Sequence, residues 1–147
     1  MGNYAENRKA RFDYEILEKY ECGIELIGTE VKSVRGGRVS LEGAFVIVRG
    51  GEAFLINANI PPYQPANAPK DYDPLHNRKL LLTKKEINEL TSSDKNKSLT
   101  IVPISVYNKG RKIKVEIALV KGKKKFDKRE SIKKRETDIE IRREYKR

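Results

Sequence analysis

The chain has 147 residues, of which 36% are charged, and it carries a formal net charge of +11. This length suits one hydrophobic core with appendages better than two ordinary domains. No apolar run approaches the roughly 20 residues that span a bilayer, and the N-terminus lacks the apolar region of a secretory signal, so we expect a cytoplasmic protein without a membrane anchor. One cysteine and one histidine exclude an internal disulfide and leave no Cys/His set for a metal ion. The excess positive charge indicates a polyanionic partner but does not by itself distinguish RNA, DNA and a membrane surface.

The first predicted elements lie before the glycine pair at Gly36-Gly37. Residues 8–20 place Phe12, Ile16 and Tyr20 at the spacing of one helix face, which predicts a short helix. Residues 22–31 alternate loosely and predict a strand that runs into a short helical turn.

A hairpin is the clearest local prediction. Two β-rich runs, residues 44–49 and 52–57, flank Gly50-Gly51, which suits a turn with positive φ. Residues 60–78 contain five prolines and no periodicity, so they predict a long connection.

A helix and two strands are predicted in the second half of the chain. Thr83 and Glu86 form a capping-box pattern that predicts a helix over residues 84–91. Residues 99–107 predict a strand in which Pro103 marks a bulge or an edge. Residues 112–120 alternate cleanly, and this alternation places Lys114 on the exposed face of a strand.

Together these elements predict a mainly β fold, an OB-like antiparallel β-barrel with about three short helices, over residues 1–120. Residues 121–147 differ in composition, because they hold 13 Lys or Arg against 6 Asp or Glu and few apolar residues. We expect this tail to be disordered in the free protein and to form a helix on a partner, since Glu130 with Lys134 and Asp138 with Arg142 have the i,i+4 spacing of helical ion pairs. The lysine-rich run from Lys121 to Lys125 predicts phosphate contacts at the start of this tail.

Catalytic chemistry finds little support. Cys22 and His76 fall on different predicted elements, so no nucleophile or base has a partner. We interpret Cys22 as a buried strand residue and His76 as a loop residue at the surface or near a phosphate. Tyr63, Tyr72 and Tyr107 are able to stack on unpaired bases but equally fit the rim or core of a domain. We therefore expect no enzyme, no cofactor and no metal site.

Six short motifs occur in a characteristic order along the chain. They occupy residues 7–11, 28–33, 51–55, 78–82, 121–124 and 127–129. In this order they resemble the SmpB family, the bacterial SsrA-binding proteins that partner transfer-messenger RNA. The likeness extends over about residues 7–135.

The resemblance implies an RNA-binding adaptor in trans-translation, monomeric when free. It would bind the tRNA-like domain of transfer-messenger RNA, stand in for the anticodon arm that this RNA lacks, and enter stalled ribosomes with it. Family residues important for RNA binding fall on Glu21, Leu81 and Lys114. The full set of candidate RNA-binding residues is Asn7, Arg8, Lys9, Glu21, Arg78, Lys79, Leu81, Lys114, Lys121, Lys123 and Lys124. For Glu21, a base-edge donor or a neighbouring arginine would be the partner, because a carboxylate repels phosphate.

The resemblance also implies a role for the tail on the ribosome. The tail would form a helix in the empty mRNA path, close to the decoding region of the small subunit, and sense the absence of downstream message. The candidate ribosome-contacting residues are Asp127, Lys128, Arg129, Lys133, Lys134 and Arg135.

Two alternatives stay open at this point. A nonspecific single-stranded RNA-binding protein of OB type would have the same charge and barrel but would tolerate any sequence. An RNA-processing enzyme would turn over RNA, although the sequence offers no catalytic set.

Overall fold

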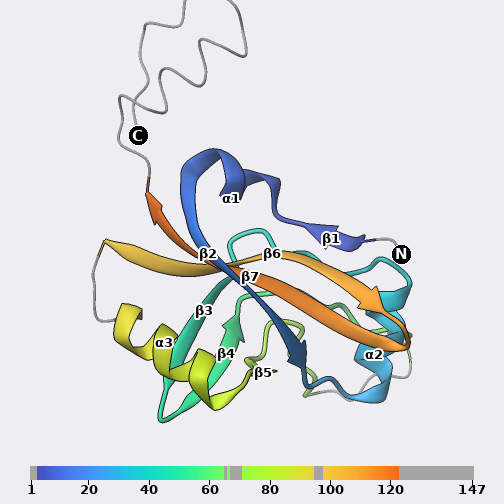
Figure 1. Cartoon of the computed structure of the whole chain (residues 1–147). Helices are drawn as coiled ribbons and strands as arrows, with labels where there is room; N and C mark the ends of the chain where they lie inside the picture. The colour runs from blue at the N-terminus through green and yellow to red at the C-terminus, as the bar shows by residue number, and fades with distance from the viewer. Residues whose placement is uncertain (1–2, 65, 67–70, 95–97, 123–147) are drawn as a thin grey trace, which may run out of the picture.

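The computed structural model describes residues 3–64, 66, 71–94 and 98–122, and the predicted tail beyond Gly122 lies outside these residues (Figure 1). The described elements, in chain order, are β1 (Asn3–Glu6), α1 (Arg8–Asp13), β2 (Tyr14–Ile24), α2 (Gly28–Arg35), β3 (Phe45–Arg49), β4 (Glu52–Ile56), β5 (Arg78–Leu81), α3 (Lys84–Asp94), β6 (Leu99–Lys109) and β7 (Lys112–Gly122). Strands dominate and three short helices accompany them. The prediction of a mainly β fold is confirmed.

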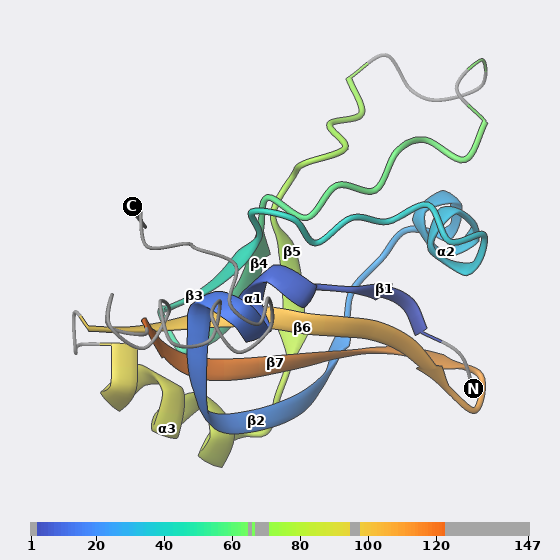
Figure 2. The same cartoon turned by 90° about the horizontal axis from the view of Figure 1, so that it is seen from above.

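All strand pairings among the described residues are antiparallel, and the sheet closes into a circuit of strands. The order is β1-β6-β3-β4-β5-β2-β7, and an additional β6–β7 pairing joins the last strand to the second. β7 lies between two long neighbours, because it pairs with β2 from Gly122 to Lys114 and with β6 from Lys121 to Lys112. The shortest pairing in this circuit is between β3 and β6, which share one register pair, Val46 and Ile101. The closed circuit leaves the long strands β2, β6 and β7 curving around one interior (Figure 2).

The interior is apolar, and α3 and α1 bury side chains in two separate clusters. α3 lies across the lower part of β3 in Figure 1 and buries Ile87 and Leu90 against the main core. α1 buries Ala10 in a second, smaller cluster against the outer face of β6 and β7, where Ala118 and Val120 are fully enclosed. Within the described residues, no helix is long and apolar enough to cross a membrane.

The N-terminal region differs from the prediction. The predicted helix over residues 8–20 is wrong beyond Asp13, because residues 14–24 form β2. A register shift between Ile16 and Glu18 inserts Leu17 as a bulge, and its side chain is 45% exposed. The bulge places two apolar residues in succession and so disguises the period of a strand as that of a helix. α2 is also longer than the short helical turn expected at the end of residues 22–31, because it runs from Gly28 to Arg35.

Other local predictions are confirmed. β3 and β4 form the hairpin, with Gly50 at φ 61° and Gly51 at φ 78°. The capping box of α3 is formed, since Thr83 N–H donates to Glu86 Oε1 at 3.0 Å and Glu86 N–H donates to Thr83 Oγ1 at 3.2 Å. The bulge expected at Pro103 appears as a register shift between Pro103 and Ser105.

A buried ion pair connects α2 to the sheet. Arg78 on β5 is 1% exposed and Glu30 on α2 is 2% exposed, and Arg78 donates to Glu30 Oε2 from Nε at 3.0 Å and from Nη2 at 2.8 Å. Arg78 Nη1 also donates to the carbonyl of Ala58 at 2.8 Å, and Glu30 Oε1 accepts from the N–H of Ile27 at 3.0 Å. The hydrogen bonds to both buried charged groups offset the free-energy cost of removing these groups from water.

The same pair anchors the long connection between β4 and β5. Tyr72 donates its hydroxyl hydrogen bond to the carbonyl of Ile60 at 2.7 Å and lies 3.0 Å from Glu30 Oε2, and His76 Nε2 lies 2.6 Å from the same oxygen. His76 is a loop residue with a side chain that is 39% exposed, as predicted, and Glu30 occupies its Nε2. Burial alone would raise the pKa of the Glu30 carboxyl, yet the hydrogen bonds from Ile27, Arg78 and His76 outweigh it and lower that pKa.

Removing Arg78 should destabilise the fold strongly. Arg78→Met leaves the buried Glu30 carboxylate without its guanidinium partner, so we expect the free energy of unfolding to fall by about 3 to 5 kcal/mol. Lys79→Met is the matched control, because Lys79 forms a half-exposed pair with Glu52 and should cost at most about 1 kcal/mol. Urea unfolding at pH 7 measures both, and equal losses would contradict the central role of the buried pair.

The pH dependence of stability should report Glu30 directly. The pKa of the Glu30 carboxyl in the folded state lies below the ordinary 4.5. The ionised carboxylate therefore contributes fully to the free energy of unfolding above pH 4.5, and this contribution is lost as the pH falls through the pKa of the folded state. Glu30→Gln removes this titration, so the stability of the variant should depend less steeply on pH below 4.5 than that of the wild type. Urea unfolding between pH 7 and pH 3 gives the free energy of unfolding of both proteins as a function of pH, and parallel curves for the wild type and Glu30→Gln would rule out this contribution.

Candidate nucleic-acid interface

The outer face of the sheet brings together residues from four strands. Register pairs align Leu81 of β5 with Gly23 of β2, Gly23 with Lys114 of β7, and Lys114 with Tyr107 of β6. Glu21 precedes Gly23 by two residues on β2 and therefore lies on the same face. We call Glu21, Gly23, Leu81, Tyr107 and Lys114 the sheet face. Four of these five residues, all except Gly23, are candidates named from the sequence.

Gly23 lies at the centre of this face, and the exposed side chain of Leu81 packs over its backbone. A β-carbon added to Gly23 would lie 3.3 Å from Cδ1 and 3.4 Å from Cβ of Leu81. The leucine is 48% exposed although it rests on the sheet. The missing side chain thus lets an apolar group lie over β2, the strand between Leu81 and Lys114. Sequence analysis missed Gly23, and an isolated glycine inside a strand was the available signal.

Glu21 is held by two donors on β6. Its carboxylate accepts a short hydrogen bond from the hydroxyl of Tyr107 and a bond from Lys109 Nζ at 3.0 Å. The hydrogen bond from Tyr107, followed by that from Lys109, lowers the pKa of the Glu21 carboxyl, while burial and the bond to Glu21 raise the pKa of Tyr107. Glu21 therefore stays ionised and fixes the directions of a tyrosine and a lysine. Its partners within the protein are these two residues and not a neighbouring arginine, and contact with a base-edge donor of the RNA stays a prediction.

Arg78 and Lys79 have different surroundings despite being neighbours. Lys79 lies on the same outer face of β5 as Leu81, and its ammonium lies 2.9 Å from Glu52. Arg78 points into the interior, and its donors are taken by Glu30 and by backbone carbonyls. The prediction of direct RNA contact by Arg78 is corrected by this burial, because the side chain has no exposed surface to offer.

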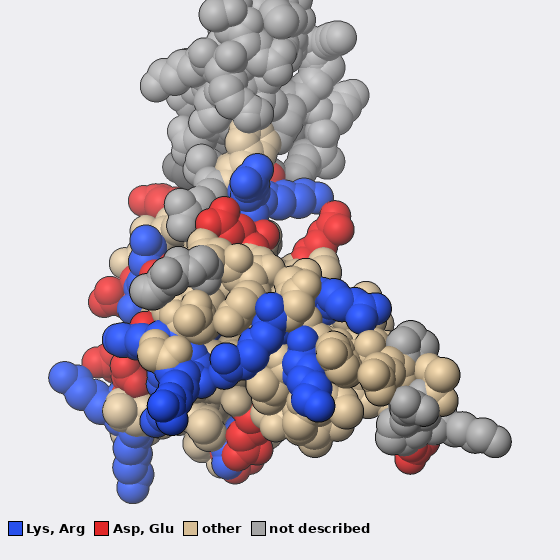
Figure 3. Space-filling model, turned by 90° about the vertical axis from the view of Figure 1, so that its right-hand side faces the viewer, with Lys and Arg blue, Asp and Glu red and all other residues tan. Residues whose placement is uncertain are grey.

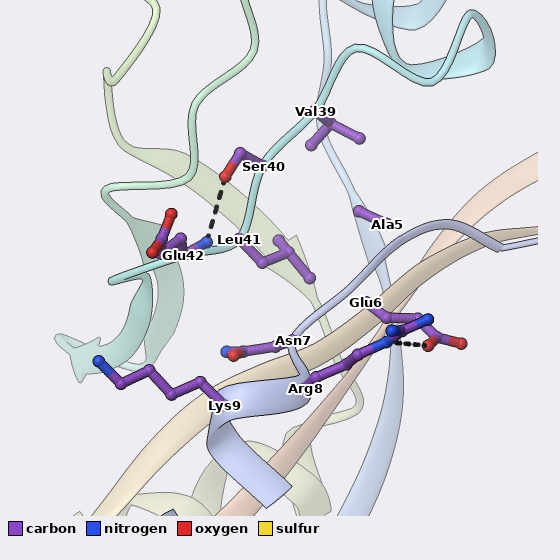
Figure 4. A pocket seen from close by; sticks show the side chains of 9 residues that line it. All are labelled: Ala5, Glu6, Asn7, Arg8, Lys9, Val39, Ser40, Leu41 and Glu42. Carbon is purple, nitrogen blue, oxygen red and sulfur yellow. Dashed lines mark hydrogen bonds and ion pairs between the residues drawn. The ribbon is translucent and has the colours of Figure 1, made fainter.

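The other described candidates lie near α1 and the end of β7. Asn7 caps α1 by accepting from the N–H of Ala10 at 3.2 Å, and its amide donates to the carbonyl of Pro103 at 3.0 Å. Arg8 and Lys9 extend in different directions from the start of α1, along an open groove of about 380 Å³ between α1 and residues 39–42 (Figure 4). Arg8 is exposed and lies 3.7 Å from Glu6.

These cations are separated from the sheet face. Lys121 is exposed and pairs in register with Glu15 at the end of β7. It stands seven residues from Lys114 on the same strand, a distance of about 23 Å at 3.3 Å per residue. The predicted candidates thus form two groups, and the remaining ones lie outside the described residues: Lys123, Lys124, Asp127, Lys128, Arg129, Lys133, Lys134 and Arg135.

The chemistry of the sheet face suits binding of a nucleic acid. Lys114 offers a cation for a phosphate, Leu81 offers an apolar surface for a base or a ribose, and Tyr107 offers the edge of an aromatic ring. Cys22, directly behind this face, is buried, and burial raises the pKa of its thiol to about 12, as expected for a structural cysteine. Across the part of the chain that the structure describes, no group of three His, Cys, Asp or Glu residues could hold a metal ion.

Comparisons with known proteins agree on one family. The family model described as SmpB protein matches residues 4–147. An SsrA-binding protein of Thermosynechococcus vestitus is 49% identical over 97% of this chain and 93% of its own length. An SsrA-binding protein of Mesoplasma florum is 53% identical over 99% of both chains, and one of Sulfurihydrogenibium is 54% identical over 97% of this chain and 93% of its own length.

A solved structure supports the same assignment. It is described as "tmRNA-SmpB: a journey to the center of the bacterial ribosome", and its matching chain superposes with a TM-score of 0.68 at 44% identity, covering 86% of this chain and 92% of that chain. The family match covers nearly the whole sequence, and the described fold is mainly β, as the predicted elements indicated. The chain belongs to the SmpB family of SsrA-binding proteins.

Proposed function

We propose that the chain is an adaptor of trans-translation. It binds the tRNA-like domain of transfer-messenger RNA and carries this RNA to stalled ribosomes, where residues 123–147 probe the empty mRNA channel near the decoding region of the small subunit. It acts by binding and not by catalysis. The names of the relatives and the SmpB chain of the solved tmRNA complex support this role.

One structural observation carries the proposal for the RNA site. Glu21, Leu81 and Lys114 come from β2, β5 and β7, yet the strand register gathers them around Gly23 on one face. We propose this sheet face as the site that recognises the tRNA-like domain. Lys114 would hold a phosphate, Leu81 would pack on a base or ribose, and Glu21 would keep Tyr107 and Lys109 in place.

A nonspecific single-stranded RNA-binding protein remains the second candidate. Such a protein would stack successive bases on exposed aromatic rings. The sheet face offers only Tyr107 for stacking, and its hydroxyl is bound to Glu21. This arrangement favours recognition of a defined RNA shape.

Substitutions on the sheet face should weaken binding to the tRNA-like domain. We expect Lys114→Ala to lower the affinity about tenfold and to reduce the slope of log K against log salt by about 1, because one phosphate contact is lost. Leu81→Ala should lower the affinity with little change in the slope, because it removes apolar contact only. Arg49→Ala and Leu17→Ala are matched controls, since both residues are exposed, Arg49 at the end of β3 and Leu17 in the bulge of β2. Filter-binding titrations at several salt concentrations measure these affinities. If the control variants bind the RNA as weakly as the site variants do, the sheet face is not the binding site.

The central glycine should be sensitive to side-chain size. Gly23→Val would displace Leu81 and so weaken RNA binding, with a smaller effect from Gly23→Ala. Gly28→Ala is the control, because a β-carbon there meets no atom within 4 Å. Unfolding curves confirm that each variant folds before its affinity is compared. Unchanged affinity in folded Gly23→Val would contradict the arrangement proposed around Gly23.

Removing the tail should separate RNA binding from ribosomal function. A chain that ends at Gly122 keeps all of β7 and its pairing with β2, so we expect it to fold and to bind the tRNA-like domain within a few-fold of the full chain. It should fail to support tagging on stalled ribosomes in a reconstituted translation assay. Full tagging activity would contradict the proposed role of residues 123–147.

A further inference from the structure

A second group of cations lies beyond the sheet face, where the turn of the β6–β7 hairpin meets α2. Lys32 and Arg35 lie in the last turn of α2, Arg38 follows the helix, and Arg111 and Lys112 belong to the hairpin turn and the start of β7. All five are exposed. We call them the α2 basic surface. Figure 3 views the side of the molecule that carries α2 and the hairpin turn, and Lys and Arg side chains gather across it with Asp and Glu toward the margins.

Carbonyl oxygens and an aromatic ring hold three of these cations in place. Arg35 Nη2 donates to the carbonyl of Arg111 at 2.7 Å, and Arg38 Nη1 donates to the carbonyl of Tyr63 at 3.2 Å. Lys32 Nζ lies 5.6 Å from the centre of the Tyr63 ring. The Arg35 bond also ties α2 to the hairpin turn, so the two parts of the surface keep their relative positions.

The charge of this surface is not compensated by acidic side chains. Among the residues that the structure describes, the ion pairs between Lys, Arg or His and Asp or Glu do not include any of these five cations. The helix dipole favours Lys32 and Arg35 at the end of α2. It does not account for Arg38, Arg111 and Lys112, which lie outside the helix. A concentration of uncompensated, positioned cations attracts a polyanion.

The α2 basic surface is continuous with the sheet face. Lys112 and Lys114 alternate with the buried Ile113 and therefore point to the same outer side of β7, about 7 Å apart along the strand. Lys109, which binds Glu21 of the sheet face, pairs in register with Lys112. A phosphate backbone that leaves Lys114 toward the hairpin turn meets Lys112 first and then Arg111 and Arg35.

We propose that the α2 basic surface binds the phosphate backbone of the same RNA that occupies the sheet face. The contacts are made to phosphates and position the RNA without reading its sequence. Arg35 and Arg38 are oriented for this by their carbonyl partners, and the exposed ring of Tyr63 lies beside them. This inference rests on the proposed function and assigns that RNA a longer footprint, from β5 across β2 and β7 to α2.

Charge removal with a matched control tests the inference. In the full-length chain, the patch variant carries Arg35→Gln, Arg38→Gln, Arg111→Gln and Lys112→Gln. The control variant carries Arg49→Gln, Lys84→Gln and Lys85→Gln, which lower the net charge by three at exposed positions outside both surfaces. The probe is the transcribed tRNA-like domain of transfer-messenger RNA, titrated at several salt concentrations with bulk tRNA as competitor.

The patch variant should lose about three units of the salt slope and bind about tenfold or more weakly, whereas the control should lose less than about one unit. A second variant, Arg111→Gln with Lys112→Gln, keeps the side chains of α2 and should lose about one to two units, which guards against a folding defect in the larger variant. Equal slopes for patch and control overturn the inference and leave the sheet face intact. Loss of ribosome binding with unchanged affinity for the tRNA-like domain also overturns it, because the surface would then serve ribosomal RNA. A wild-type chain that shows no preference for the tRNA-like domain over bulk tRNA overturns the proposed function and this inference together.

Discussion

The pairing of β7 on both of its edges organises the molecule. β7 is bound to β2 along one side and to β6 along the other over nearly all of its eleven residues, and these two ladders close the sheet. A strand fixed on both edges cannot slip by one residue without exchanging its buried and exposed faces. The positions of Lys114 on the sheet face and Lys112 near α2 follow from this register. The exit of the chain toward residues 123–147 is set by the same strand at Gly122.

The buried pair of Glu30 and Arg78 adds a second constraint. It joins α2 and the long connection after β4 to β5, at the edge of the interior. The hydrogen bond from Arg35 to Arg111 then fixes the outer end of α2 to the hairpin turn. Structural polar contacts inside the molecule thereby determine where its surface cations are held. A variant with a weakened Glu30–Arg78 pair is expected to lose stability before it loses any direct contact with a partner.

The sequence was sufficient for elements with a short-range signal. The paired glycines at positions 50 and 51 and the capping box at Thr83 and Glu86 act over a few residues, and the structure contains both features. The strand from Tyr14 was missed because its pattern is interrupted by the bulge at Leu17 and its pairing partner lies about a hundred residues away. Predicting that pairing requires knowledge of the tertiary structure.

The candidate site was predictable in part for similar reasons. The alternation of β7 placed Lys114 on an outer face, which the register pairs support. Nothing in the alternation of β5 distinguishes Arg78 from Lys79 as a surface cation, since burial of an arginine depends on Glu30 from a distant helix. The isolated glycine at position 23 was a signal in the sequence, but the alignment of the strands was needed to show that Leu81 rests over it.

The most direct test of this account is binding of the full-length chain to the tRNA-like domain of transfer-messenger RNA in a large excess of bulk tRNA. The account predicts tight binding that persists under the competitor, because the strand register presents an apolar group, a fixed carboxylate and a lysine together on one face. Binding that disappears as bulk tRNA is added would contradict it and would leave a basic barrel that holds RNA through charge alone.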